Sequence, residues 1–120
     1  MRTCYRTLII ILAVAFLSCE ELINEDNISG ETVVLSAPSD GAALAQTDIV
    51  LSWETLDGAA EYQLQIAQPS FAAPLQIVKD SVVTGNHVSV SLNPNSYEWR
   101  VKARNSAYET GFSTWSFTIN

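Results

Sequence analysis

The stretch YEWRVKAR, residues 97–104, alternates strictly between uncharged and charged side chains. Consecutive side chains of a β-strand point to opposite faces of the sheet, so this pattern predicts a half-buried strand. The inward side chains are expected to be those of Tyr97, Trp99, Val101 and Ala103. The outward side chains are expected to be those of Glu98, Arg100, Lys102 and Arg104.

The same period of two recurs on both sides of this strand, and turn-forming residues such as Asp57-Gly58 interrupt it. Besides 97–104, the predicted strands are 32–37, 48–54, 61–68, 87–92 and 113–119. Residues 75–83, which follow a loop from Pro69 to Pro74, form either one strand or two short ones. This succession of short strands predicts an all-β fold, a seven-stranded immunoglobulin-like β-sandwich.

Four segments carry a family resemblance: Leu51-Ser52-Trp53-Glu54, Tyr62-Gln63-Leu64-Gln65-Ile66, Leu92-Asn93-Pro94 and residues 97–105. Together they resemble fibronectin type III domains, particularly bacterial ones, over about Val33 to Ile119. The resemblance implies that Trp53 is the central tryptophan of the core and that the Tyr97 hydroxyl binds backbone at a corner between strands. The expected structural core comprises Trp53, Tyr62, Leu92, Tyr97, Trp99 and Trp115.

The segment Gly111 to Ser116 (GFSTWS) resembles the tryptophan-serine box of cytokine-receptor-type fibronectin domains, with Phe112 in place of the first tryptophan. The resemblance implies that an aromatic side chain of this box stacks on the outward cations Arg100, Lys102 and Arg104, a cation-π arrangement. The period of two instead places Trp115 in the core, because it alternates together with Phe117 and Ile119. We favour the core for Trp115 and leave the stacked position as the alternative.

The N-terminus has the organisation of a signal peptide. Arg2 and Arg6 precede an apolar run of ten residues, Leu8 to Leu17, which is too short to cross a bilayer core of about 30 Å. The run ends in Phe16-Leu17-Ser18-Cys19, which resembles the lipobox of bacterial lipoproteins. The resemblance implies cleavage after residue 18 and lipidation of Cys19; ordinary secretion with cleavage near Ser18 is the alternative.

Residues 19–31 are expected to form a lipidated cysteine and an acidic, solvated tether, since Glu20, Glu21, Glu25 and Asp26 lie within it. An acidic run after the cysteine also resembles the signal by which certain Gram-negative bacteria export lipoproteins to the cell surface; a plain linker is the alternative. The folded domain is expected at residues 32–120. The expected location is the bacterial outer membrane, where the lipid-anchored domain faces either the cell surface or the periplasm.

The chain of 120 residues carries 6 Lys+Arg against 13 Asp+Glu. Removing Arg2 and Arg6 with the signal peptide leaves four basic residues against thirteen acidic ones, a net charge of −9. An acidic surface argues against nucleic acid as a partner and against electrostatic adsorption to anionic lipid. The expected membrane attachment is therefore covalent, through Cys19.

The residues of the predicted domain do not favour catalysis. Its single histidine, His87, lacks the further ligands that a metal site needs. The acids Glu54, Asp57 and Glu61 flank a turn, where nothing would remove one of them from solvent and split their pKa values. We expect no catalytic residues, no metal and no cofactor, and we predict that the protein is not an enzyme.

The possible binding residues are aromatics in loops and cations on one strand: Phe71, Tyr108, Phe112, Arg100, Lys102 and Arg104. Loops at the ends of a rigid sandwich commonly carry binding residues. The sequence predicts a non-catalytic protein-interaction or spacer module of the cell envelope, with an unidentified envelope protein or polysaccharide as partner. The alternative is a carbohydrate-binding accessory lipoprotein, which would be favoured if Phe71, Tyr108 or Trp115 were exposed on one flat surface.

Overall fold

The computed structural model describes residues 25–120, so the predicted signal peptide, Cys19 and the first acids of the tether lie outside the described residues. Residues 25–120 contain strands and no helix, hence no helix that could cross a membrane. The strands are β1 (Leu35–Ala37), β2 (Ala42–Leu44), β3 (Asp48–Trp53), β4 (Glu61–Gln68), β5 (Gln76–Val83), β6 (His87–Ser91), β7 (Asn95–Arg104) and β8 (Ser113–Ile119). The predicted all-β fold is confirmed.

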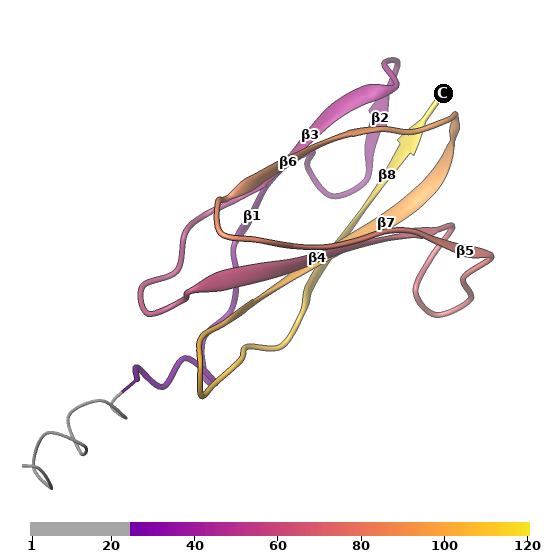
Figure 1. Ribbon diagram of the computed structural model, residues 1–120. Coiled ribbons are helices and arrows are strands. Elements are labelled where there is room, and N and C mark those ends of the chain that lie inside the picture. Colours follow the sequence, from indigo (N-terminus) through magenta and orange to yellow (C-terminus); the bar gives the residue numbers. More distant parts are fainter. Residues whose placement is uncertain (1–24) are drawn as a thin grey trace, which may run out of the picture.

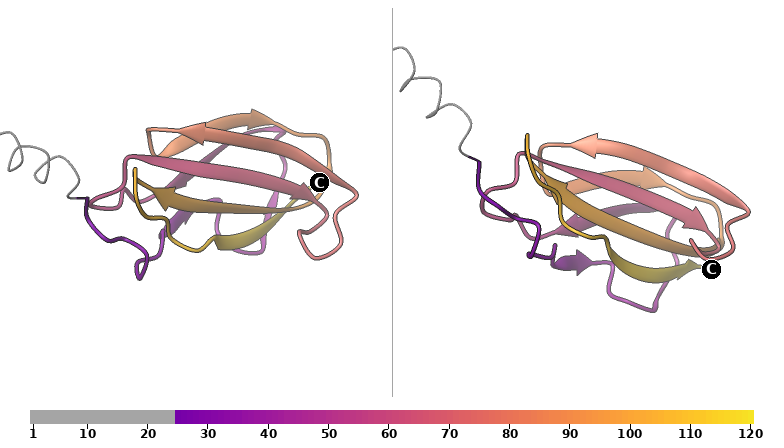
Figure 2. Two further views of the ribbon diagram at one scale, coloured as in Figure 1. Left: turned by 60° about the horizontal axis from the view of Figure 1, so that its bottom comes forward. Right: turned by 90° about the horizontal axis from the view of Figure 1, so that it is seen from below.

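The strands form two sheets that pack face to face (Figures 1 and 2). The smaller sheet has the order β1-β3-β6, and the larger has the order β2-β8-β7-β4-β5. Strand β7, which contains the stretch 97–104, lies in the middle of the larger sheet, antiparallel to β4 and β8. Its inward side chains are buried against the smaller sheet, and its outward side chains lie on the open face of the larger sheet.

The number of strands differs from the prediction, because residues 25–120 form eight strands rather than seven. The predicted strand 32–37 is shorter, and after a turn at Gly41 the chain crosses to the larger sheet as β2. Strand β2 pairs parallel with β8 over only three residues, which is too short for a period of two to be visible in sequence. Residues 76–83 form the single strand β5, which leaves a bulge opposite Ile66 and Ala67.

The predicted solvated tether was expected to extend to Glu31, and this is wrong for Ile28. The Ile28 side chain is only 2% exposed and belongs to the hydrophobic core. It packs close to the turn at Gly58, where an added Cβ would lie 3.0 Å from the Ile28 Cγ2 atom. An isolated apolar residue in an acidic segment carries no periodicity, but burial of its side chain is favourable by about 1.5–3 kcal/mol.

The sandwich has two ends, which we call proximal and distal. At the proximal end, the described chain begins beside residues 54–60 and 105–112: the Asn105 side-chain amide donates to the carbonyl oxygens of Asp26 and Gly58. At the distal end lie residues 69–75 and the C-terminus, as Figure 1 shows. The N-terminal segment therefore meets the domain at the end opposite to the C-terminus.

Candidate binding surface on the outer face of the larger sheet

The outer face of the larger sheet carries a row of polar side chains that runs across four strands. In the strand register, Arg100 of β7 lies opposite Thr114 of β8 and opposite Gln65 of β4, and Gln65 lies opposite Asp80 of β5. Residues paired in this way point to the same face of a sheet, so the row lies entirely on the outside. Strand pairing thus brings together residues that are far apart in the sequence.

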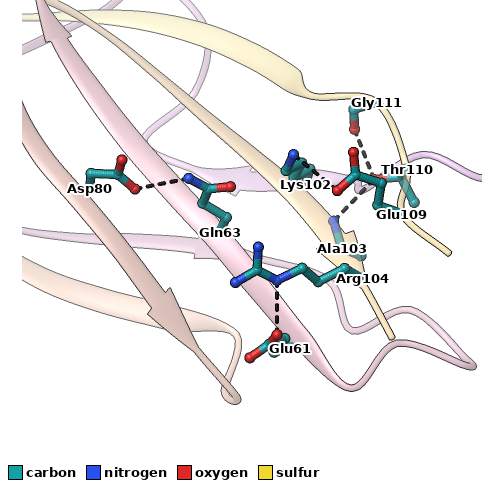
Figure 3. Close-up of polar contacts among 9 residues, drawn as sticks. All are labelled: Glu61, Gln63, Asp80, Lys102, Ala103, Arg104, Glu109, Thr110 and Gly111. Atoms are coloured by element: carbon teal, nitrogen blue, oxygen red, sulfur yellow. Dashed lines mark hydrogen bonds and ion pairs between the residues drawn. The ribbon is translucent and has the colours of Figure 1, made fainter. Parts of the chain in front are cut away.

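Two of the three outward cations of β7 are neutralised by ion pairs, which Figure 3 shows. The Lys102 Nζ atom lies 3.1 Å from Oε2 of Glu109. The Arg104 Nε atom lies 2.8 Å from Oε1 of Glu61, which is also its partner in the strand register. These cations are therefore engaged within the domain and do not form a free basic stripe.

Arg100 is held by a chain of hydrogen bonds instead of an ion pair. Its Nε donates to Oε1 of Gln65 at 2.8 Å, and Nε2 of Gln65 donates to Oδ2 of Asp80 at 3.1 Å. Nε2 of Gln63 donates to Oδ1 of Asp80 at 3.0 Å (Figure 3). The pKa of Asp80 is lowered by the hydrogen bonds from Gln63 and Gln65 and, to a lesser extent, by the charges of Arg100 and Arg104. Asp80 therefore stays ionised and orients Gln65, which in turn orients Arg100.

Two aromatic rings from different loops flank the Arg100 guanidinium. The Cζ atom of Arg100 lies 4.0 Å from the ring centroid of Phe71 and 4.2 Å from that of Phe112. The Nζ atom of Lys102 lies 5.0 Å from the Phe112 centroid. The backbone N–H of Phe71 donates to Oε1 of Glu98 at 2.8 Å, which holds the loop 69–75 on this face. Phe112 thus stacks on two cations of β7, and Phe71 adds a second ring.

Tyr108 and Trp115 lie away from this cluster. Tyr108 is 38% exposed and belongs to the loop 105–112 at the proximal end. Trp115 is opposite Trp99 in the register, so its side chain lies on the inner face, where it is partly buried and contacts Trp99 edge to face with centroids 6.3 Å apart. Of the loop aromatics, only Phe71 and Phe112 are brought together.

The remaining side chains expected in the core are buried: Trp53, Tyr62, Leu92, Tyr97 and Trp99. The Tyr97 hydroxyl donates to the Asn93 carbonyl oxygen at 2.6 Å, and burial raises the pKa of this hydroxyl. The bond spans the turn between β6 and β7, so Tyr97 fixes the crossing from one sheet to the other.

The polar side chains that orient Arg100, those of Gln63, Gln65 and Asp80, were not predicted as site residues. The alternation in β4 indicates only that Gln63 and Gln65 face outward. Their contact with Asp80 and Arg100 depends on strand order and register. A signal was available for Gln63 and Gln65 but not for Asp80, since a fibronectin type III topology would have placed the strand 61–68 beside residues 97–104.

The groups weighed for catalysis or metal binding are dispersed. His87 is exposed and has Asn86 as its side-chain neighbour. Glu61 is engaged with Arg104. Within residues 25–120, no three His, Cys, Asp or Glu side chains are grouped closely enough to hold a metal ion.

Comparison with protein-family models and with curated proteins finds no match for this chain. Several solved fibronectin type III domains have a similar structure. The domain derived from the human KIAA0970 protein is 14% identical, with a TM-score of 0.56 over 73% of this chain and 72% of that chain. The domain of the human collagen alpha-1(XX) chain is 15% identical, with a TM-score of 0.55 over 76% and 88%.

A bacterial structure is also similar: the fibronectin(III)-like modules of CbhA from Clostridium thermocellum are 9% identical, with a TM-score of 0.53 over 74% of this chain and 96% of that chain. At such identities the similarity shows the fold alone. The chain is an all-β sandwich with the fold of a fibronectin type III domain.

Proposed function

We propose that this fibronectin type III-like sandwich is a non-catalytic interaction or spacer module that is displayed on the bacterial cell envelope. The observation that carries the proposal is the separation of its two ends. The N-terminal segment is bound to the proximal end through Ile28 and Asn105, whereas the loop 69–75 lies at the distal end. A domain that is held at one end presents the other end, and the long faces of its sheets, to a partner.

In this proposal, lipid attached to Cys19 anchors the protein in the outer membrane. The acidic residues that follow Cys19 act as the signal for export to the cell surface. The support comes from the sequence: the short apolar run, the lipobox-like Phe16-Leu17-Ser18-Cys19 and the acids that follow. Several acyl chains on one residue would hold the protein stably, since each buried methylene contributes about 0.8 kcal/mol.

We favour a protein partner over a carbohydrate, because the aromatic side chains do not form one flat exposed surface. Phe71 stacks on Arg100 and Trp115 faces inward. Tyr108 lies at the proximal end, in the loop whose residues Asn105 and Ser106 contact the N-terminal segment. A sugar-binding platform would need at least two exposed rings side by side, whereas the Phe71 and Phe112 rings flank a cation.

The experiment compares intact mass and protease accessibility of the wild-type protein, Cys19→Ala and the matched control Cys4→Ala in the native bacterium. We expect the wild type and Cys4→Ala to yield a species that begins at Cys19 with added acyl mass and is cleaved when whole cells are treated with protease. Cys19→Ala should lose the acyl mass and the membrane association. An unmodified wild-type protein released into the medium would refute the anchored module.

A further inference from the structure

Arg100 differs from the other two cations of β7 in its bonding. Lys102 and Arg104 each have a carboxylate partner. Arg100 forms no ion pair within residues 25–120; its Nε donates to Gln65, and its two terminal amino groups donate to no described residue. A guanidinium whose terminal amino groups are free can accept a carboxylate in a bidentate geometry.

The free edge of this guanidinium is held in a fixed orientation. Phe71 and Phe112 lie at 4.0 and 4.2 Å from its Cζ atom, and Gln65, itself bound to Asp80, fixes its Nε. Aromatic rings and a hydrogen bond on three sides restrict the rotation of a long side chain before any ligand arrives. Less conformational entropy is therefore lost when the ligand binds.

The surroundings of Arg100 on the same face are aliphatic as well as polar. Ile77 and Val82 of β5 are 47% and 46% exposed, and their register partners Ala67 and Gln63 pair in turn with outward residues of β7. Leu75, which precedes β5, is 84% exposed. A central arginine with aromatic neighbours and an aliphatic margin is typical of the residues that dominate protein-protein interfaces.

We propose that Arg100 is the anchor residue of this face and binds a carboxylate side chain of a partner protein, with Phe71 and Phe112 enclosing the pair. This inference rests on the interaction function proposed above and specifies the chemistry of its partner. The partner presents an aspartate or glutamate flanked by apolar residues, which would contact Ile77 and Val82. Asp80 and Glu98 share this face, and their carboxylates already accept hydrogen bonds from Gln63, Gln65 and the Phe71 N–H. Acids more than about 8 Å away are screened at physiological ionic strength.

The test uses the full chain in detergent and two peptides, acetyl-Val-Glu-Val-amide and acetyl-Val-Gln-Val-amide. Binding is followed by the NMR shift of the Arg100 Nε–H group, with the Arg104 Nε–H group as an internal reference. We expect the glutamate peptide to bind about tenfold more tightly than the glutamine peptide and to shift the Arg100 signal alone. A carboxylate carries the opposite charge and accepts two parallel N–H bonds from the guanidinium, whereas the glutamine amide has one acceptor oxygen.

Three variants sharpen the result. Arg100→Gln should abolish the preference for glutamate, Arg100→Lys should keep only part of it because the planar fork is lost, and Arg104→Gln should leave it unchanged. Arg100→Lys retains a cation between the rings, so it tests the proposal even where Arg100→Gln fails to fold.

Equal binding of both peptides, or equal loss of preference in Arg104→Gln, would overturn the proposal. Binding of a galacturonate trisaccharide at Arg100 without binding of the glutamate peptide would overturn it too, in favour of an acidic polysaccharide. None of these results depends on lipidation of Cys19, so failure here is distinguishable from failure of the display function.

Discussion

The two ends of the sandwich are held together in different ways. At the proximal end, segments far apart in the chain are tied to one another: Asn105 bonds to Asp26 and Gly58, and the Ser106 hydroxyl donates to Glu25. At the distal end, the loop 69–75 is closed by the bond from the Leu75 N–H to the Gln68 carbonyl and is tied to β7 by the bond from the Phe71 N–H to Glu98. The proximal end therefore holds the N-terminal segment, whereas the distal loop is held by residues of the larger sheet.

Asn105 shows how tightly the proximal end is connected. Its amide nitrogen donates twice, and its Oδ1 atom accepts from the N–H groups of Ala107 and Tyr108. This uses both donors and both lone pairs of the side chain. One residue therefore joins the N-terminal segment, the turn at Gly58 and the loop 105–112.

The largest effect is expected from Ile28→Ala. Truncating this buried side chain should lower the free energy of unfolding by about 2–5 kcal/mol, because it leaves a cavity at the proximal end. The measurement is urea denaturation, with Leu75→Ala as the distal control. Leu75 is 84% exposed, so its truncation should change stability by no more than about 0.5 kcal/mol. Equal effects of the two substitutions would show that the N-terminal segment is not part of the domain core.

A second prediction compares two glycines with positive φ. An alanine at Gly58 (φ 87°) would place its Cβ 2.9 Å from the Asp26 Cβ, whereas at Gly41 (φ 78°) nothing lies within 4 Å. Gly41→Ala should therefore lower the free energy of unfolding only through backbone strain, by about 1–2 kcal/mol. Gly58→Ala should cost about 1–3 kcal/mol more, because the N-terminal segment must move away.

The thermal unfolding midpoints of Gly58→Ala and Gly41→Ala are compared to measure this extra cost. A shortened chain serves as the control. In a chain that begins at Glu31, the extra cost at Gly58 should disappear, since Asp26 and Ile28 are gone. If it persists, the contact with the N-terminal segment is not the cause.

Whether a feature could be predicted from the sequence depends on how far apart along the chain its interacting residues lie. The two faces of residues 97–104 are local properties of the chain, so alternation alone predicted them. Ile28 was missed because a single apolar residue has no period, and β2 because three residues are too few. The contact of Arg100 with Gln65 joins residues 35 positions apart and depends on the register between β4 and β7. Alternation specifies which face a residue occupies, but not which neighbour it meets there.

Phe71→Ala should loosen the distal loop and lower the free energy of unfolding by a smaller amount, about 1 kcal/mol. The loss combines a half-exposed cation-π contact, worth about 0.5–1 kcal/mol, with some apolar contact. Hydrogen exchange should show faster opening of the Phe71 and Leu75 amides, while the amides of Ala107 and Tyr108 at the proximal end stay unchanged. Equal acceleration at both ends would mean that the ends are not independent.

The smallest effect on stability is expected from replacing Asp80, the acid that orients Gln65 and hence Arg100. The pKa of Asp80 is below its ordinary value of 3.8 in the folded protein, so the ionised carboxylate favours the folded state. This contribution is present above the pKa of the unfolded chain and is lost as the pH falls through the lower, folded value. Asp80→Asn should therefore be less stable than the wild type at about pH 6, and the difference should shrink toward about pH 3.

Because Asp80 is exposed, solvent screens its interactions, and the whole difference should stay below about 1 kcal/mol. Asp57→Asn is the matched control, since the Asp57 side chain is exposed and accepts no hydrogen bond from the described side chains. A destabilisation by Asp80→Asn that does not vary between these pH values would mean that the bonds to Gln63 and Gln65 do not need the charge. The row across the sheet would then orient Arg100 without the charge of Asp80.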